Sequence, residues 1–355
     1  MSLYLITAEQ AIARLSDFSA IIDARSPAEF AQDHLPGAVN WPTLDDEQRH
    51  LVGTEYKQVS AFEAKKRGAA IAARNIAAHI ERELMHTPKD WAPLLYCWRG
   101  GKRSGSLGLM LDQIGFRVSL IEGGYKAFRS AVIEDLARQV QRLHWQVICG
   151  TTGSGKTRLL HALAEQGAQV LDLEGLARHR SSVLGLIPGE KQPTQKAYDT
   201  LIWDALRKFS ADRPVYVESE SRKVGNLALA ESLISAMRSS PCLRLELDDT
   251  SRVALLIEEY PFFVSNTEFF CERLASLIEV RGREQVQHWQ ELARSGRTAA
   301  VVQDLLTHHY DPAYLASIRR NFRHYETAPS LRPQDHSHRA LRALAQQILG
   351  RPTVA

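Results

Sequence analysis

The sequence lacks several features that would assign it to a membrane, secreted or metal-bound class. It has no run of about 18 apolar residues, so no segment is expected to span a membrane. Its first residues, MSLYLITAEQAIARL, lack a basic stretch followed by an apolar core, so secretion is not expected. Its cysteines form no CxxC pair, which argues against a zinc site and a disulfide framework: Cys97, Cys149, Cys242 and Cys271. We therefore expect a reducing, cytoplasmic location, where a thiol stays reactive.

A strong net charge is also missing. The formal net charge at pH 7 is +3, and 44% hydrophobic with 24% charged residues is typical of a globular protein. With 355 residues the chain is long enough for two domains. Lysine is absent from residues 271–355, where 12 Arg and 8 acidic residues leave an excess of +4. A solvated helical surface is the usual reason for such an excess, although arginine without lysine also suits phosphate contacts.

Residues 1–140 alternate short apolar runs with helical patterns. Strands are predicted at 4–7, 20–25, 94–97 and 118–124, and helices at 8–18, 62–85, 104–114 and 124–142. This alternation predicts a mainly parallel sheet covered on both faces. Binding crevices in such sheets lie beyond the carboxyl ends of the strands, and Cys97 ends one of them.

The stretch CWRGGKRS, residues 97–104, places a lone cysteine before cations and glycines. Ser104 is expected to cap the following helix, whose dipole would favour an anion. Two glycines allow backbone N–H groups to turn toward the sulfur, and three cations favour the nucleophilic thiolate: Gly100 and Gly101, with Arg99, Lys102 and Arg103. The loop therefore predicts a reactive Cys97 able to hold an extra sulfur or selenium atom. The alternative is a buried structural cysteine beside surface charges.

The stretch GTTGSGKT, residues 150–157, matches the phosphate-loop pattern G-x-x-x-x-G-K-[ST]. An apolar strand precedes it and an amphipathic helix follows it, as the pattern requires. Backbone amides would face phosphate oxygens, Lys156 would reach the terminal phosphates, and Thr157 is suited to ligating Mg²⁺. The predicted diphosphate-binding residues are Gly150, Thr152, Gly153, Ser154, Gly155, Lys156 and Thr157.

An acidic residue after a second strand often helps to hold the metal of a phosphate loop. RPVYVESESRK, residues 213–223, supplies Glu218 and Glu220, while QVLDLEG, residues 169–175, supplies Asp172 and Glu174. Glu218 is the preferred metal-side candidate, and the metal itself stays open. Arg222 and Lys223 would either clamp an anion or be solvated surface charges. No adenine-specific segment stands out downstream, so any diphosphate ester is a candidate ligand.

Residues 225–355 are predicted to be mostly helical. Helical spacing predicts a row of core positions: Val286, Trp289, Leu292, Val301, Val302, Leu305 and Leu306. The stretch HHYDP, residues 308–312, is interpreted as a helix end with a proline stop, with a metal or base contact as the alternative. TAPSLRPQDHSHR, residues 327–339, is predicted to be a loop before a last short helix.

Three stretches of residues 1–140 resemble the rhodanese family. They are IIDARSPAEFAQDHLPGAVNWP (21–42), the loop at 97–104 and GFRVSLIEGGYKAFR (115–129). The resemblance implies that Cys97 carries a chalcogen and passes it onward. It also makes Asp23 and Arg25 a structural ion pair. This loop is longer and more basic than in many sulfurtransferases, which argues against simple thiosulfate as the substrate.

A rhodanese loop of the form CWRGG followed by a phosphate loop resembles the tRNA 2-selenouridine synthase family over the whole chain. The resemblance implies an enzyme acting on the wobble uridine (U34) of the tRNAs for Lys, Glu and Gln. It implies S-geranylation of 2-thiouridine by geranyl diphosphate, and then replacement of the geranylthio group by selenium from selenophosphate. Cys97 would carry the selenium, and we expect the phosphate loop to bind geranyl diphosphate.

The predicted fold class is α/β. A rhodanese-like parallel-sheet domain is expected at 1–140, and a P-loop NTPase-like α/β domain with a helical, Arg-rich C-terminal part at 141–355. Two other functions stay open. An ATP-dependent tRNA sulfurtransferase would hydrolyse nucleotide and work without selenophosphate. A redox sensor would show no turnover.

Overall fold

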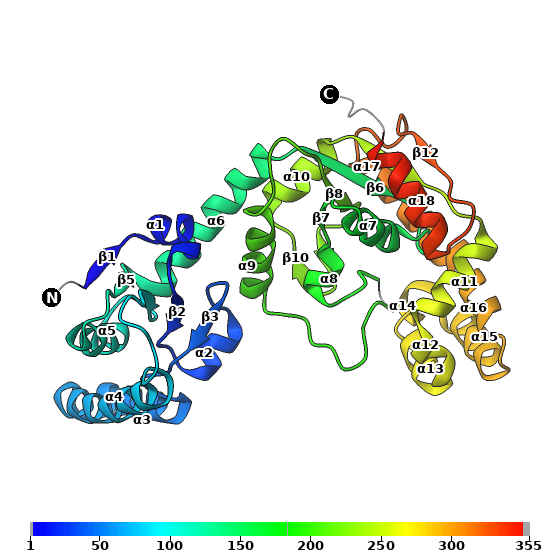
Figure 1. Ribbon diagram of the computed structural model, residues 1–355. Helices are drawn as coiled ribbons and strands as arrows, with labels where there is room; N and C mark the ends of the chain where they lie inside the picture. Colours follow the sequence, from blue (N-terminus) through cyan, green and yellow to red (C-terminus); the bar gives the residue numbers. More distant parts are fainter. Residues whose placement is uncertain (1–2, 183, 351–355) are drawn as a thin grey trace. The chain divides into compact units, whose positions relative to one another are not determined.

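A computed structural model describes residues 3–182 and 184–350 of the chain. The chain divides into two compact units (Figure 1). One contains the chain up to Leu136 together with Pro193–Asp204, and the other contains Ala137–Gln192 and the residues from Ala205 onward. Within the described ranges, none of the helices combines the length and the apolar character needed to cross a membrane.

The first unit is built on a parallel sheet. Its five described strands lie in the order β1-β5-β4-β2-β3, and every pairing is parallel. The strands are β1 (Tyr4–Ile6), β2 (Ala20–Asp23), β3 (Ala38–Asn40), β4 (Pro93–Tyr96) and β5 (Ser119–Ile121). All four residues of β4 are buried, as expected for the central strand of a sheet covered on both faces.

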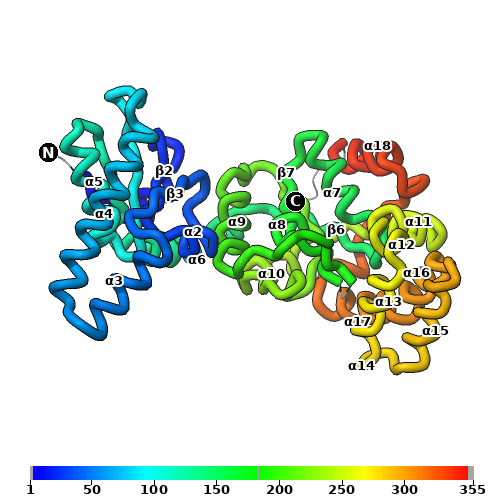
Figure 2. The backbone as a smooth tube through the Cα atoms, turned by 90° about the horizontal axis from the view of Figure 1, so that it is seen from below, coloured from blue at the N-terminus to red at the C-terminus, as the bar shows by residue number. Residues whose placement is uncertain are grey.

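Helices cover this sheet and connect its strands. They are α1 (Ala8–Ala13), a 3₁₀ turn (Leu15–Asp17), α2 (Pro27–Gln32), α3 (Asp46–Gln58), α4 (Ala61–Glu83), α5 (Lys102–Ile114) and α6 (Gly124–Arg142). Helices α3 and α4 run side by side (Figure 2). Ile76 of α4, Leu107 and Leu111 of α5 and Leu95 of β4 join one apolar core that also contains Cys97.

A segment from the middle of the chain belongs to this first unit. Residues 193–204 include most of α9 (Gln195–Leu206), although they lie between elements of the second unit in the sequence. Trp203 is 1% exposed and donates its indole N–H to Asp135 over 2.8 Å. Thr200 donates to Asp33 over 3.1 Å. These buried contacts fix the segment on α6 and on the end of α2.

The second unit has its own parallel sheet. Its five described strands lie in the order β12-β11-β6-β8-β7. They are β6 (Trp145–Cys149), β7 (Gln169–Leu171), β8 (Val215–Glu218), β11 (Cys242–Leu245) and β12 (Ser330–Leu331). A separate antiparallel pair is formed by β9 (Lys223–Val224) and β10 (Leu227–Ala228).

Helices form the rest of the second unit. They are α7 (Lys156–Glu165), α8 (Leu173–Ala177), α10 (Glu231–Ser239), α11 (Asp249–Glu259), α12 (Pro261–Ser265), α13 (Thr267–Ala275), α14 (Ile278–Arg281), α15 (Arg283–Arg294), α16 (Thr298–Leu305), a π-helical segment (Leu306–Tyr310), α17 (Asp311–Asn321) and α18 (His338–Leu349). Helices α11 to α16 gather into a helical layer, drawn in yellow and orange in Figures 1 and 2.

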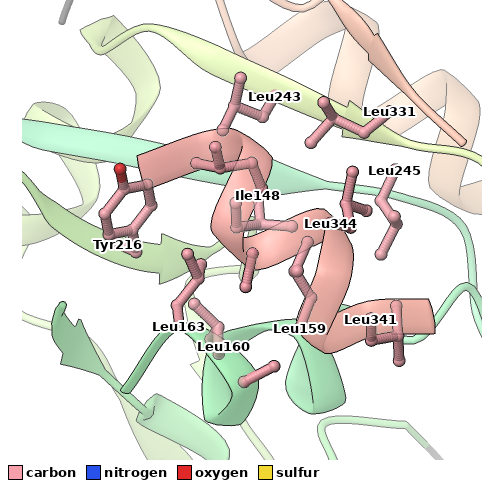
Figure 3. Packing of buried hydrophobic residues seen from close by; sticks show 13 residues of the cluster. Ile148, Leu159, Leu160, Leu163, Tyr216, Leu243, Leu245, Leu331, Leu341 and Leu344 are labelled. Atoms are coloured by element: carbon pink, nitrogen blue, oxygen red, sulfur yellow. The ribbon is translucent and has the colours of Figure 1, made fainter. Parts of the chain in front are cut away.

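The core of the second unit joins the sheet to α7 and α18. Figure 3 shows Leu159, Leu160 and Leu163 of α7 facing Leu341 and Leu344 of α18, with residues of β6, β8, β11 and β12 completing the cluster. Burial of one such leucine contributes about 1.5–3 kcal/mol. The cluster therefore anchors α7, and α7 begins at the phosphate loop.

The structure confirms the α/β prediction and corrects it in places. Every strand and helix predicted in residues 1–140 is present, the helix at 124–142 with the predicted ends and the others with shifted ends, and three elements were missed: α2, α3 and β3. In residues 225–355 three strands were also missed, β10, β11 and β12. The interpretation of HHYDP as a proline stop was wrong, because a π-helical segment continues from α16 directly into α17 and Pro312 lies in the first turn of α17. Trp289 is fully buried, as predicted.

Candidate functional site

The two predicted loops occupy equivalent places in their sheets. The Cys97 loop follows β4, and the phosphate loop follows β6. Each of these strands is the middle one of its described sheet, and each loop ends in the first turn of a helix, α5 or α7. The carboxyl end of a central parallel strand is where α/β folds place their binding sites.

The sulfur of Cys97 accepts two hydrogen bonds within its own loop. The backbone N–H of Gly101 lies 3.3 Å from Sγ, and the Ser104 hydroxyl lies 3.2 Å from it. The side chain is 3% exposed. Both groups donate toward the sulfur, and donors of this kind stabilise a thiolate and any anion attached to it.

Ser104 has a different role from the predicted one. The sequence predicted that it caps the helix, but α5 begins two residues earlier, at Lys102, with Gly101 as the N-cap residue. Ser104 therefore lies in the first turn, where its side chain points back to Cys97. The helix N-terminus and a hydroxyl thus act on the same sulfur.

Close packing of two glycines fixes the backbone of the Cys97 loop. Gly124 has a φ of +58°, and a Cβ there would lie 2.2 Å from the Cys97 carbonyl oxygen and 2.4 Å from the Gly100 nitrogen. Gly100 has a φ of +64°, and a Cβ there would lie 2.7 Å from the Ile121 carbonyl oxygen. The N–H of Tyr125 donates to the Cys97 carbonyl over 2.8 Å. Only glycine fits both positions, so the start of α6 holds the loop in place.

The cations of the loop differ in their surroundings. Arg103 forms an ion pair with Glu29 at 2.6 Å, and Arg49 reaches the same carboxylate at 3.3 Å. Burial would raise the pKa of Glu29, but these arginines outweigh it and lower that pKa. Arg99 and Lys102 are exposed. Their predicted contact with an incoming anion stays a prediction.

Asp23 and Arg25 form the predicted structural pair beneath this loop. Both are at most 1% exposed, and their closest side-chain atoms lie 2.6 Å apart. Arg25 also donates to the Asp33 carbonyl at 2.6 Å and lies over the Tyr125 ring at 3.9 Å. Such a buried pair is costly to break, by about 3–5 kcal/mol when one partner is removed.

The phosphate loop runs between β6 and α7. Lys156 donates to the Gly150 carbonyl oxygen over 2.8 Å, and its ammonium lies 5.5 Å from the centre of the Tyr314 ring. The Gly150 N–H donates to the Tyr314 hydroxyl over 2.8 Å. Lys156 therefore rests on the loop's own carbonyl, from which its flexible side chain can turn toward a phosphate group.

A buried arginine braces the other side of this loop. Arg252 of α11 is 4% exposed and donates to the Thr152 carbonyl over 2.8 and 3.0 Å. Its guanidinium pairs with Asp249 at 2.9 Å and with Asp311 at 2.5 Å. Asp311 is the acidic residue of the HHYDP stretch, so this stretch supports the phosphate loop. Sequence reasoning missed Arg252 and Tyr314, because both come from distant helices that carry no local signal.

Three carboxylates meet beside Lys156. Carboxylate oxygens of Glu174, Glu218 and Glu220 lie within 4.8 Å of one another. Burial, reinforced by repulsion among the three, raises the pKa of Glu174 to about 10 and that of Glu218 to about 7, although Lys156 opposes both shifts. Burial also raises the pKa of Glu220. All three residues were candidates in the sequence analysis, but nothing in the sequence predicted that their side chains lie close to one another.

Two polar atoms at this place lack a partner among the described residues. Ser154 Oγ and Glu218 Oε1 are buried and accept or donate no hydrogen bond there. Buried polar groups are nearly always satisfied, so we expect a ligand or a water molecule to pair with these two atoms. Mg²⁺ prefers oxygen ligands such as carboxylates, and the three glutamates therefore fit this metal.

The remaining acid and base candidates have other partners. Asp172 receives the Gly175 N–H at 2.8 Å and lies 3.0 Å from the His161 ring nitrogen. Arg222 is exposed and pairs with Glu231. Lys223 is exposed on β9. An anion contact by Arg222 or Lys223 stays a prediction.

The fold and the two loops define a class of protein in which a rhodanese-like unit and a P-loop unit share one chain. Comparison with known families agrees. Residues 7–131 match the rhodanese-like domain, and residues 143–277 match the family described as the tRNA 2-selenouridine synthase AAA domain.

Curated relatives identify the family. The chain is 33% identical over 326 residues to a tRNA 2-selenouridine synthase of Alcanivorax borkumensis, covering 83% of this chain and 88% of that protein. A synthase of Aeromonas salmonicida is 32% identical over the same length, covering 86% of that protein. One of Nitrosomonas europaea is 38% identical over 244 residues, covering 68% of this chain and 63% of that protein. The chain belongs to the tRNA 2-selenouridine synthase family, a family of tRNA-modifying transferases.

Proposed function

We propose that this protein converts 2-thiouridine at the wobble position (U34) of tRNA to 2-selenouridine through an S-geranylated intermediate. Residues 141–355 carry the geranyl transfer and residues 1–140 carry the selenium transfer. The tRNAs for Lys, Glu and Gln are the proposed substrates. The proposal rests on one observation: a sulfur held by anion-stabilising donors and a phosphate loop with unpaired buried oxygens occur in the same chain.

The first step uses the phosphate loop. The sulfur of 2-thiouridine attacks C1 of geranyl diphosphate, a C–S bond forms, and the C1–O bond breaks with its electron pair leaving on the diphosphate. The N3 proton of the base is released to water, which leaves a neutral S-alkylated base. Lys156 and the amides at the start of α7 stabilise the charge that develops on the leaving group. S-alkylation neutralises the sulfur and makes it a leaving group for the second step.

Mg²⁺ fits the first step. Thr157 and Glu218 would hold it, and when bound it would neutralise diphosphate charge. Lys156 keeps its own task, which is to bind and orient the terminal phosphate.

The second step uses Cys97. Its thiolate takes selenium from selenophosphate, so an S–Se bond forms and the Se–P bond breaks with its electrons staying on phosphorus, which leaves as phosphite. The selenium then attacks C2 of the geranylated base, and geranylthiolate leaves. Two molecules of a thiol reductant then cleave the S–Se bond: the selenium stays on C2 of the base, the two thiols leave as a disulfide, and the Cys97 thiol is restored. Gly101 and Ser104 stabilise the charge on the Cys97 group throughout.

The proposal is tested by incubating the protein with 2-thiouridine tRNA and geranyl diphosphate, with and without selenophosphate. Mass analysis of the wobble nucleoside should show S-geranyl-2-thiouridine without selenophosphate and 2-selenouridine with it. Formation of selenouridine with ATP in place of geranyl diphosphate would contradict the geranyl step. ATP-dependent formation of a modified base without selenophosphate would favour a tRNA sulfurtransferase.

A further inference from the structure

An apolar pocket opens beside the phosphate loop. It lies among α11, α12, α13, α16 and the π-helical segment, and its enclosed volume is about 50 Å³, within a wider space of about 520 Å³ that includes open solvent. A cavity of about 10–15 Å³ on this measure holds one water molecule, so the enclosed part is narrow and most of the space is open to solvent. The lining is aliphatic and aromatic apart from a few hydroxyls, and none of the described side chains lining it is charged. The pocket is therefore suited to a hydrocarbon group.

The pocket and the phosphate loop share a wall. Thr152 of the loop is itself a lining residue. Leu256 of α11 lines the pocket and packs on the loop, because a Cβ at Gly153 would lie 3.0 Å from its Cγ and Cδ1 atoms. A ligand with phosphates on the loop would therefore have its remaining part next to Leu256.

The pocket extends away from the loop along α11. Tyr260 follows Leu256 by four residues, a rise of about 6 Å along a helix. Beyond it the Phe263 and Phe270 rings lie 4.8 Å apart, and both are buried. Val302 of α16 lines the same space and is half-buried. The lining therefore includes Thr152 and Leu256 beside the phosphate loop as well as the aromatic rings of Phe263 and Phe270.

We propose that this pocket binds the hydrocarbon chain of the allylic diphosphate and selects its length. This inference rests on the proposed function and adds the part of the site that distinguishes a ten-carbon chain from shorter and longer ones. The apolar walls offer a nucleobase no amide or charged partner, whereas a chain of isoprene units needs only apolar contact. The aromatic rings limit how long a chain the pocket accepts.

Val302→Phe tests the pocket, because the larger ring would fill space that the chain needs. We expect binding of geranyl diphosphate to weaken about 10- to 100-fold, as overpacking of a fitted pocket does. Binding of inorganic diphosphate should stay within about twofold, since the phosphate loop is unchanged. Val280→Phe is the matched control, because Val280 lies on α14 and is 65% exposed. Calorimetric titration of the purified full chain measures both affinities.

Val302→Ala tests the pocket in the opposite direction, because it enlarges the pocket and does not require room for a larger side chain. It should raise the affinity for farnesyl diphosphate relative to geranyl diphosphate, while Val302→Phe should favour dimethylallyl diphosphate. The pocket assignment would be overturned if Val302→Phe weakened the binding of geranyl diphosphate and of inorganic diphosphate equally. It would also be overturned if neither variant changed the preference for chain length. It would also be overturned if Val302→Phe weakened the binding of ATP more than the binding of geranyl diphosphate. If wild-type protein shows these chain-length preferences but transfers no geranyl group to tRNA, the proposed function fails and the hydrocarbon pocket stands.

Discussion

The Cys97 loop and the phosphate loop have the same place in their sheets but differ in how their polar atoms are hydrogen-bonded. Both follow the middle strand of a parallel sheet, and both end in the first turn of a helix. In the Cys97 loop, the Gly101 N–H and the Ser104 hydroxyl donate hydrogen bonds to the sulfur of Cys97. Among the described residues, Ser154 Oγ of the phosphate loop and Glu218 Oε1 at the end of β8 have no hydrogen-bond partner. On the proposed function, the Cys97 loop carries a covalently held group, and the phosphate loop binds a ligand and releases it.

The charged residues near the two loops also differ. Around the Cys97 loop, the carboxylate of Glu29 is paired with Arg103 and Arg49. Beside the phosphate loop, three carboxylates share one lysine, and the pKa of Glu174 and of Glu218 is raised. Carboxylates that outnumber the cations beside a phosphate loop fit a site where a divalent cation binds together with the phosphates.

Replacing the sulfur should give the largest effect. With Cys97→Ser we expect selenouridine formation to fall at least about 1,000-fold, because serine cannot carry selenium. Geranylated tRNA should accumulate at the wild-type rate, which mass analysis of the nucleosides measures. Cys271→Ser is the control, since Cys271 is a buried, free cysteine in α13. Loss of both activities in Cys97→Ser would contradict the division of labour between the loops.

Removing one donor to the sulfur should give an intermediate effect. Ser104→Ala deletes the 3.2 Å hydrogen bond to Cys97 Sγ. A hydrogen bond to a charged group contributes about 1.5–3 kcal/mol, so selenium transfer to pre-geranylated tRNA should slow about 10- to 100-fold. Ser106→Ala, on an exposed position of the same helix, should leave the rate unchanged. An unchanged rate in Ser104→Ala would show that the hydroxyl does not stabilise the reacting sulfur.

A change in the acidic cluster should give the smallest effect, seen in stability. Glu218 has a folded-state pKa of about 7 against an ordinary value of 4.5, because burial disfavours its charge. The stability that its protonation contributes is full below pH 4.5 and is lost as the pH rises through 7. Glu218→Gln should therefore melt higher than wild type at pH 8, by about 2–4 °C for each kcal/mol recovered, and about equally at pH 5.

Mg²⁺ sharpens this stability comparison. At pH 8 it should raise the melting temperature of the wild type but not that of Glu218→Gln. Glu272→Gln, at an exposed position of α13, is the control for loss of one negative charge. A melting temperature that falls in Glu218→Gln at pH 8 would mean that Glu218 is a stabilising residue of the fold.

The sequence predicted the parts of the site that are encoded locally. The phosphate loop needs a strand, a glycine-rich turn and a helix in direct succession, and all three lie within residues 145–165. The Cys97 loop is equally local. The helix start at Lys102 was missed because the polar residues of KRS resemble a loop, whereas the donors of Gly101 and the packing of Gly100 against Gly124 fix an earlier start.

Parts that depend on distant residues were not predictable in the same way. Glu174 and Glu220 meet because β7 and β8 lie side by side, which the sequence does not show. Arg252 supports Thr152 across 100 positions. The pocket lining comes from several short helices, each of which reads as ordinary core. The docking of residues 193–204 on the first unit depends on Trp203 and Thr200 finding Asp135 and Asp33.

The most direct test of the two-loop account is the conversion of pre-geranylated tRNA by Lys156→Ala in the presence of selenophosphate. The substitution removes the cation that serves the diphosphate but leaves Cys97, Gly101 and Ser104 untouched. Selenouridine should form from this substrate at close to the wild-type rate, while 2-thiouridine tRNA with geranyl diphosphate should react about 100- to 1,000-fold more slowly. Failure to convert pre-geranylated tRNA, in a variant that melts like the wild type, would contradict the account.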